Sequence, residues 1–120
     1  PDGLVGADGM IECKSRRQKY QVQTIVEHWR DGTAPSDYLL QVQTAMLVTG
    51  RGWCDLISYS GGLPMIPMRI ERDEKTCAAI LDACADAETK IAAIIEDYHA
   101  AVAGRALIPT ERRVEQEMFA

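Results

Sequence analysis

The chain has 120 residues, of which 47% are hydrophobic and 26% charged, and its formal net charge is −5 at pH 7. This length and composition indicate a single globular domain, residues 1–120, with a modest core. The sequence contains neither a membrane-spanning apolar stretch nor an opening signal peptide. The acidic charge argues against a passive nucleic-acid coat protein, but not against an enzyme that acts on DNA.

Residues 1–14 are predicted to form a β-hairpin, because three glycines in the first nine residues let the chain turn back. Side chains two apart on a strand share one face, so Glu12 and Lys14 project together, about 6–7 Å apart. A closed hairpin brings Asp2 to the same place. Two carboxylates and an ammonium group then converge, a set that holds a hard divalent cation and places a lysine beside its water. A hairpin with a solvated Glu and Lys on its outer face fits the same pattern.

Ile11 and Cys13 are expected to point to the other face of this strand, into apolar packing. The four cysteines form no C-x-x-C pair, so they do not support a zinc site. We interpret them as reduced, which suits a cytoplasmic protein, and the spacing of Cys77 and Cys84 is that of two buried helix positions.

Two helices are predicted next. Residues 15–30 form an irregular helix, and a second helix runs from Asp37 to about Val48, with Ser36 as its cap and Thr49-Gly50 as its end. The second helix is apolar enough to be buried on most sides. It carries Gln41, whose amide either makes a structural bond to nearby backbone or points into a site and holds a water or phosphate oxygen.

Residues 53–60 and 65–71 are predicted strands, the second at an edge or irregular position because it contains Pro67. A long helix follows from Asp73 to about Ala103 and ends at Gly104. A final amphipathic segment contains Val114, Met118 and Phe119. The order of strands and helices predicts an α/β (α+β) fold with a mixed sheet flanked by helices.

Short basic clusters at Arg16-Arg17 with Lys19, and at Arg112-Arg113, are able to touch phosphate, although such pairs are usually solvated.

The sequence resembles the lambda-type exonucleases of the YqaJ-like viral recombinase family, within the PD-(D/E)xK nuclease superfamily. The segments that carry the resemblance are Pro1-Asp2-Gly3, Ile11-Glu12-Cys13-Lys14, the helix from Tyr38 to Arg51 with its Tyr-x-x-Gln, Trp53-Cys54-Asp55 with Tyr59, and Ile70-Glu71-Arg72-Asp73-Glu74. They follow in the family's order, and the combination is far more specific than a lone D…ExK.

The resemblance implies a PD-(D/E)xK restriction-endonuclease-like core and a role for each matched residue. Asp2, Glu12 and the backbone carbonyl of Cys13 match the metal ligands. Lys14 matches the lysine that orients the attacking water, and Gln41 matches the glutamine beside the nucleophile. Tyr38, one turn before Gln41, is a weaker candidate for substrate contact. Arg16, in a basic cluster, is another.

The resemblance also implies an activity. The family digests one strand of duplex DNA from its 5′ end with Mg²⁺, for which Mn²⁺ can substitute, and releases mononucleotides. Expected partners are DNA ends, a single-strand annealing protein and two further copies in a trimer, in the cytoplasm of a bacterium that carries the phage or prophage. Family members have an upstream helical region, so we expect part of the fold to lie before Pro1.

Two other functions fit the residues. A same-fold restriction or structure-specific endonuclease would cut closed circular DNA. A non-catalytic DNA-binding module would keep the fold without cutting, although the presence of Asp2, Glu12 and Lys14 argues against this.

Overall fold

The computed structural model describes residues 1–112 of the 120-residue chain. They fall into two compact units, of which the first is residues 1–84 and the second starts at Ala85. The first unit contains the sheet and every residue assigned above to the candidate site. The predicted C-terminal segment with Val114, Met118 and Phe119 lies outside the described residues.

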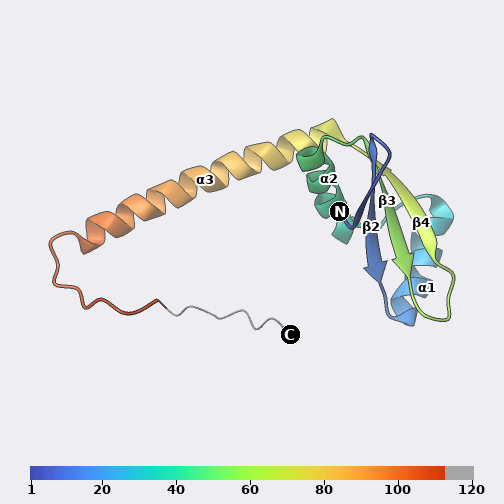
Figure 1. The fold of residues 1–120 in the computed structure, drawn as a ribbon, viewed down its shortest axis with the longest axis horizontal. Helices are drawn as coiled ribbons and strands as arrows, with labels where there is room; N and C mark the ends of the chain where they lie inside the picture. The colour runs from blue at the N-terminus through green and yellow to red at the C-terminus, as the bar shows by residue number, and fades with distance from the viewer. Residues whose placement is uncertain (113–120) are drawn as a thin grey trace. The chain divides into compact units, whose positions relative to one another are not determined.

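The first unit is built on a four-stranded mixed sheet in the order β1-β2-β3-β4 (Figure 1). The strands are β1 (Gly3–Val5), β2 (Gly9–Ser15), β3 (Trp53–Tyr59) and β4 (Ile66–Glu71). β2 pairs antiparallel with β1 and parallel with β3, and β4 runs antiparallel at the edge. The predicted hairpin, the mixed sheet and the edge position of Pro67 are confirmed.

Helices connect β2 to β3, because two parallel strands require a crossover. They are α1 (Gln18–Glu27), the short 3₁₀ helix η1 (Trp29–Asp31) and α2 (Ser36–Thr49). Gly50 ends α2 with a φ of 69°, a conformation that glycine adopts without strain.

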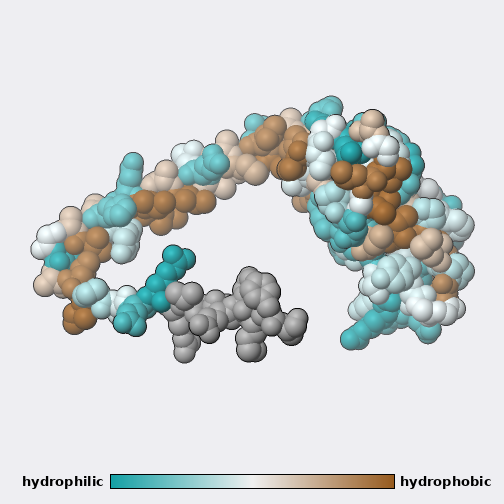
Figure 2. All heavy atoms as spheres, in the orientation of Figure 1, coloured by the Kyte–Doolittle hydropathy of each residue, from teal (hydrophilic) through white to brown (hydrophobic). Residues whose placement is uncertain are grey.

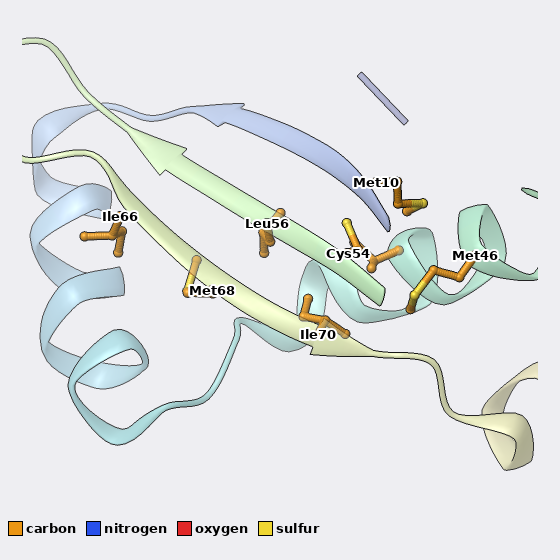
Figure 3. Packing of buried hydrophobic residues seen from close by; sticks show 8 residues of the cluster. Met10, Met46, Cys54, Leu56, Ile66, Met68 and Ile70 are labelled. Carbon is orange, nitrogen blue, oxygen red and sulfur yellow. The ribbon is translucent and has the colours of Figure 1, made fainter. Parts of the chain in front are cut away.

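The core lies between one face of the sheet and the helices of this crossover (Figure 3). Residues of β4 alternate between buried and exposed, as expected for a strand with one covered face. The buried apolar cluster consists of Met10, Val42, Met46, Cys54, Leu56, Ile66, Met68 and Ile70. These side chains fix α2 against β2, β3 and β4.

Three expectations about the covered surfaces are wrong. Cys13 is exposed and Ile11 only partly buried, because the helices cover the Met10 and Glu12 face of β2 instead. α2 is not buried on most sides, since Leu40 is 63% and Val48 80% exposed. One face of α2 packs on the sheet, and no other layer of the described residues covers its outer face.

The start of α2 also differs from the prediction. Ser36 is the first helical residue, Pro35 occupies the cap position, and no side chain caps the helix. Pro35 has an extended ψ of 130°, and its carbonyl accepts a hydrogen bond from the Tyr38 N–H at 3.2 Å, so the helix begins directly after it at Ser36.

Helix α3 runs from Glu74 to Val102. Asp73 accepts hydrogen bonds from the Thr76 hydroxyl and from the backbone N–H groups of Lys75 and Thr76. These hydrogen bonds lower the pKa of the Asp73 carboxyl group, and the bond from the Thr76 hydroxyl has the largest effect. Cys77 is buried, but Cys84 is exposed, contrary to expectation. In the part of α3 that belongs to the second unit, apolar side chains are exposed, among them Ile91, Ile94, Ile95 and Tyr98 (Figure 2). Of the helices in residues 1–112, none has the length and hydropathy to cross a membrane.

The packing of α2 on the sheet predicts a large effect for Met46. Its side chain is 0% exposed, so Met46→Ala should lower the free energy of unfolding by about 2–5 kcal/mol, as for other large-to-small core changes. Val48→Ala on the same helix, at an 80% exposed position, should change it by less than about 0.5 kcal/mol. Urea denaturation followed by circular dichroism measures both, and equal losses would contradict this account of the core.

Candidate active site

The hairpin holds Asp2 against β2. The backbone N–H of Asp2 donates to the Ile11 carbonyl at 2.9 Å, and the Cys13 N–H donates to Asp2 Oδ2 at 2.6 Å. The N–H and C=O of a strand residue point to the same edge, so the Cys13 carbonyl is directed to the side where Asp2 lies. Asp2 therefore lies beside Glu12 and Cys13 of β2.

The turn of the hairpin is tied to the loop before β3. Arg51 Nη1 donates to the carbonyls of Gly6 at 3.0 Å and Gly9 at 2.6 Å. The Gly52 N–H donates to Asp8 Oδ1 at 2.9 Å. A Cβ at Gly9 would lie 2.0 Å from the Trp53 ring, so only glycine allows β2 and β3 to approach here. These contacts fix the position of β1 and of Asp2.

Glu12, Lys14 and Gln41 form a closed triangle of hydrogen bonds, called here the Glu12–Lys14–Gln41 cluster. Lys14 Nζ lies 2.7 Å from Glu12 Oε1 and 2.9 Å from Gln41 Oε1, and Gln41 Nε2 donates to Glu12 Oε1 at 2.7 Å. The amide thus presents its oxygen to the ammonium and its nitrogen to the carboxylate. Gln41 is exposed and bonds to side chains of β2, which excludes the alternative of a buried amide bonded to nearby backbone.

The carboxylate of this cluster is largely shielded from water. Glu12 is only 7% exposed and packs beside the apolar core. Taking a carboxylate and an ammonium out of water is costly, and their mutual attraction with the added amide bonds offsets that cost.

Tyr38 lies next to this cluster, one turn before Gln41 on α2. Its hydroxyl accepts from Arg16 Nη1 at 2.6 Å. Lys14 Nζ lies 5.2 Å and Arg16 Cζ 5.4 Å from the centroid of its ring, within the range of cation–π attraction. The ring therefore connects Lys14 with Arg16.

The oxygen atoms of Asp2, Glu12 and the Cys13 carbonyl are of the kind that a hard divalent cation binds. Among the hydrogen bonds of residues 1–112, each carboxylate has one oxygen engaged, Oδ2 in Asp2 and Oε1 in Glu12, which leaves Oδ1 and Oε2 for a ligand. With the Cys13 carbonyl they offer the few oxygen ligands that Mg²⁺ takes from proteins, the rest being water. No group of three His, Cys, Asp or Glu side chains suited to a metal occurs in this part of the chain. Any cation here thus depends on the backbone carbonyl and water.

The thiol of Cys54 is not suited to act in this site. Burial, followed by the nearby charges of Glu12 and Asp55, raises the pKa of the Cys54 thiol to about 11. Cys54 therefore stays protonated in the core at neutral pH, where a thiolate ligand or nucleophile would need the opposite shift.

The structure also shows polar residues that the sequence pattern did not single out. Gln21 is fully buried in α1, donates to the carbonyls of Ser58 at 3.1 Å and Pro64 at 2.8 Å, and accepts from the Ser58 hydroxyl at 2.6 Å. Gln43 is the buried amide of α2 and bonds to the Glu71 carbonyl and the Asp73 N–H. The only sequence signal was a glutamine at the apolar stripe of each helix.

Comparisons with known proteins are consistent with this geometry. A model of the YqaJ-like viral recombinase domain matches residues 1–52. A crystal structure of an alkaline exonuclease (LHK-Exo) from Laribacter hongkongensis matches with 36% identity and a TM-score of 0.76, over 86% of this chain and 53% of that one. The structure of LHK-Exo in complex with dAMP matches over the same shares and with the same identity, with a TM-score of 0.75.

The chain thus spans about half the length of the solved structures that it matches. A search of curated proteins found no match. The family model covers the hairpin and α2, which hold Asp2, Glu12, Lys14 and Gln41, and the structural match extends over the sheet. The motifs, the fold and both comparisons agree in their support for the YqaJ-like viral recombinase family.

Proposed function

We propose that this chain is the catalytic part of a Mg²⁺-dependent exonuclease that digests one strand of double-stranded DNA from its 5′ end. The observation that carries the proposal is the Glu12–Lys14–Gln41 cluster beside Asp2. The similar protein from Laribacter hongkongensis is an alkaline exonuclease whose structure has been determined with dAMP, a deoxynucleoside monophosphate of the kind that this reaction releases.

Each residue has a role in phosphodiester hydrolysis. Asp2, Glu12 and the Cys13 carbonyl would hold Mg²⁺, or Mn²⁺ in its place. When bound, the ion supplies charge neutralisation at the phosphate and lowers the pKa of a water. Lys14 Nζ orients that water and stabilises charge that develops on the phosphate oxygens.

Gln41 and its neighbours position these groups. The Gln41 amide bonds Lys14 and Glu12 at once and would hold the ammonium and the carboxylate next to each other. Tyr38 and Arg16 lie beside Lys14 and would contact the DNA backbone, Arg16 through charge-assisted hydrogen bonds.

The wider setting of the proposal is phage recombination. The single strand that remains after digestion would be handed to an annealing protein. The active assembly would be a homotrimer, acting in the cytoplasm of a bacterium that carries the phage or prophage.

A DNA digestion assay tests this function. We expect the full-length protein with Mg²⁺ to release mononucleotides from linear duplexes, faster when the 5′ ends are phosphorylated, and EDTA to stop the release. Closed circular duplex should stay intact. Cutting of the circle would indicate an endonuclease of the same fold, and DNA binding without any cutting would indicate a non-catalytic module.

A further inference from the structure

A pocket lies between α1 and the start of α2, beside the Glu12–Lys14–Gln41 cluster. Its volume is about 160 Å³, and Arg16, Tyr20, Gln23, His28 and Asp37 contribute to its lining. We propose that this pocket binds one nucleotide of the DNA strand next to the scissile phosphodiester, with the base in the pocket and its phosphate on Arg16. The inference rests on the proposed function, because it adds a contact to the same strand.

Arg16 connects the pocket with the cluster. Its guanidinium donates to the Tyr38 hydroxyl at 2.6 Å, and Lys14 Nζ lies 5.2 Å from the centroid of the same ring. Lys14 and Arg16 are two residues apart along the chain leaving β2, so their Cα atoms lie at most about 7 Å apart. A strand whose scissile phosphate meets Lys14 therefore places an adjacent nucleotide at Arg16.

Arg16 has capacity for an anion. A guanidinium carries five N–H donors, and within residues 1–112 the side chain of Arg16 makes one hydrogen bond and no ion pair. Its Cζ is held at 5.4 Å from the Tyr38 ring and 5.5 Å from the Tyr20 ring. A positive charge that is oriented by two rings and has donors to spare is suited to a phosphate group.

Tyr20 offers a face for stacking. Its side chain is 42% exposed although it lines a concave surface, and Lys19 Nζ lies 4.7 Å from its ring centroid. Bases stack on such rings with little regard to sequence, since every base has a π-face. An exposed tyrosine ring flanked by two cationic side chains is suited to bind a base of single-stranded DNA and its phosphate.

The size and polarity of the pocket suit a base better than a phosphate group. A volume of about 160 Å³ equals roughly five waters of the liquid, which is enough for one planar ring system. Asp37 on the wall repels phosphate but accepts hydrogen bonds from the amino groups of bases. His28 Nδ1 is engaged by Thr33 Oγ1 at 3.2 Å, and its ring lines the pocket beside Gln23. The phosphate is thus left to Arg16 at the edge.

A double-mutant cycle that combines Tyr20→Ala with removal of one DNA base tests the proposal. Binding is measured by fluorescence anisotropy with full-length protein and a labelled duplex with an unpaired 5′ end, in Ca²⁺ and without Mg²⁺. Tyr20→Ala should raise Kd about tenfold, the effect expected for one lost base stack. In a series of duplexes, an abasic residue takes each of the first positions of the 5′ strand in turn. At one of these positions it should raise the Kd of the unmodified protein by about the same factor as Tyr20→Ala does. At that position Tyr20→Ala should add little further loss.

Two control variants keep this test specific. Tyr20→Phe retains the ring and should bind like the unmodified protein. Tyr59→Ala removes a tyrosine of the same 42% exposure from β3, where strand alternation puts its side chain on the sheet face opposite to Ser58, and should leave Kd unchanged. Equal losses from Tyr20→Ala on normal and on every abasic duplex would overturn the proposal.

Arg16 provides a second measurement. Arg16→Gln should reduce the slope of log K against log salt by about 0.7 to 0.9, the contribution of one phosphate contact. An unchanged slope would overturn the role of Arg16. Binding in Ca²⁺ does not require hydrolysis, so absence of digestion would refute the proposed function while the cycle and the slope still decide on the pocket.

Discussion

Lys14→Ala should reduce the rate of Mg²⁺-dependent digestion by at least about 100-fold, the loss typical for removal of one group that stabilises transition-state charge. The ammonium lies 2.7 Å from Glu12 and 2.9 Å from Gln41, so its position is fixed before substrate binds. Glu12 and Gln41 keep their own hydrogen bond at 2.7 Å in the variant, and we therefore expect it to fold. Release of mononucleotides from a linear duplex measures the rate.

Lys90→Ala is the matched control. Lys90 also forms an ion pair, with Asp86 at 2.9 Å, but it is an exposed residue of α3 in the second unit. Its digestion rate should stay within about twofold of the unmodified protein, and both variants should keep the circular dichroism spectrum. Cleavage by Lys14→Ala at the unmodified rate would refute the role of Lys14.

Glu12→Gln should abolish binding of the divalent cation. The change keeps the shape of the side chain but removes the charge that a hard cation requires. In the unmodified protein, Mg²⁺ or Mn²⁺ at 100 times its Kd should stabilise the fold by about 2.7 kcal/mol, because only the folded state holds the ligands together. Thermal unfolding with and without the ion measures this shift, which Glu12→Gln should lose.

Glu27→Gln serves as the control for this variant. Glu27 likewise accepts a hydrogen bond from a glutamine amide, from Gln23 Nε2 at 2.9 Å, but it is exposed on α1. It should keep the full shift on addition of the ion. If Glu12→Gln kept the shift as well, the cation would bind elsewhere and the assignment of Glu12 would be wrong.

The site was predictable where local geometry decides it. Strand alternation alone placed Glu12 and Lys14 on one face, and the structure puts their charged atoms 2.7 Å apart. The glycine-rich start predicted the hairpin that carries Asp2 to the Cys13 N–H. Gln41 entered through the family motif, and the structure supplies the reason for its place, a bond to both charged partners.

Other parts were not predictable from local patterns. Alternation separates Met10 and Glu12 from Ile11 and Cys13 but does not tell which pair a helix will cover. We expected Ile11 and Cys13 to be packed, but the helices cover Met10 and Glu12 instead. The same limit explains Gln21, whose three hydrogen bonds join residues 37 or more positions apart in the chain.

The sequence by itself determined the hairpin, the order of strands and helices, and the presence of two carboxylates and a lysine at strand spacing. These follow from short-range sterics and from the period of each element, which act between neighbours in the chain. Only the tertiary structure decided that α2 brings Gln41 and Tyr38 onto β2, and that α1 and α2 enclose a pocket beside Arg16. These contacts result from burial of apolar surface between distant segments, and no local pattern specifies which surfaces will meet.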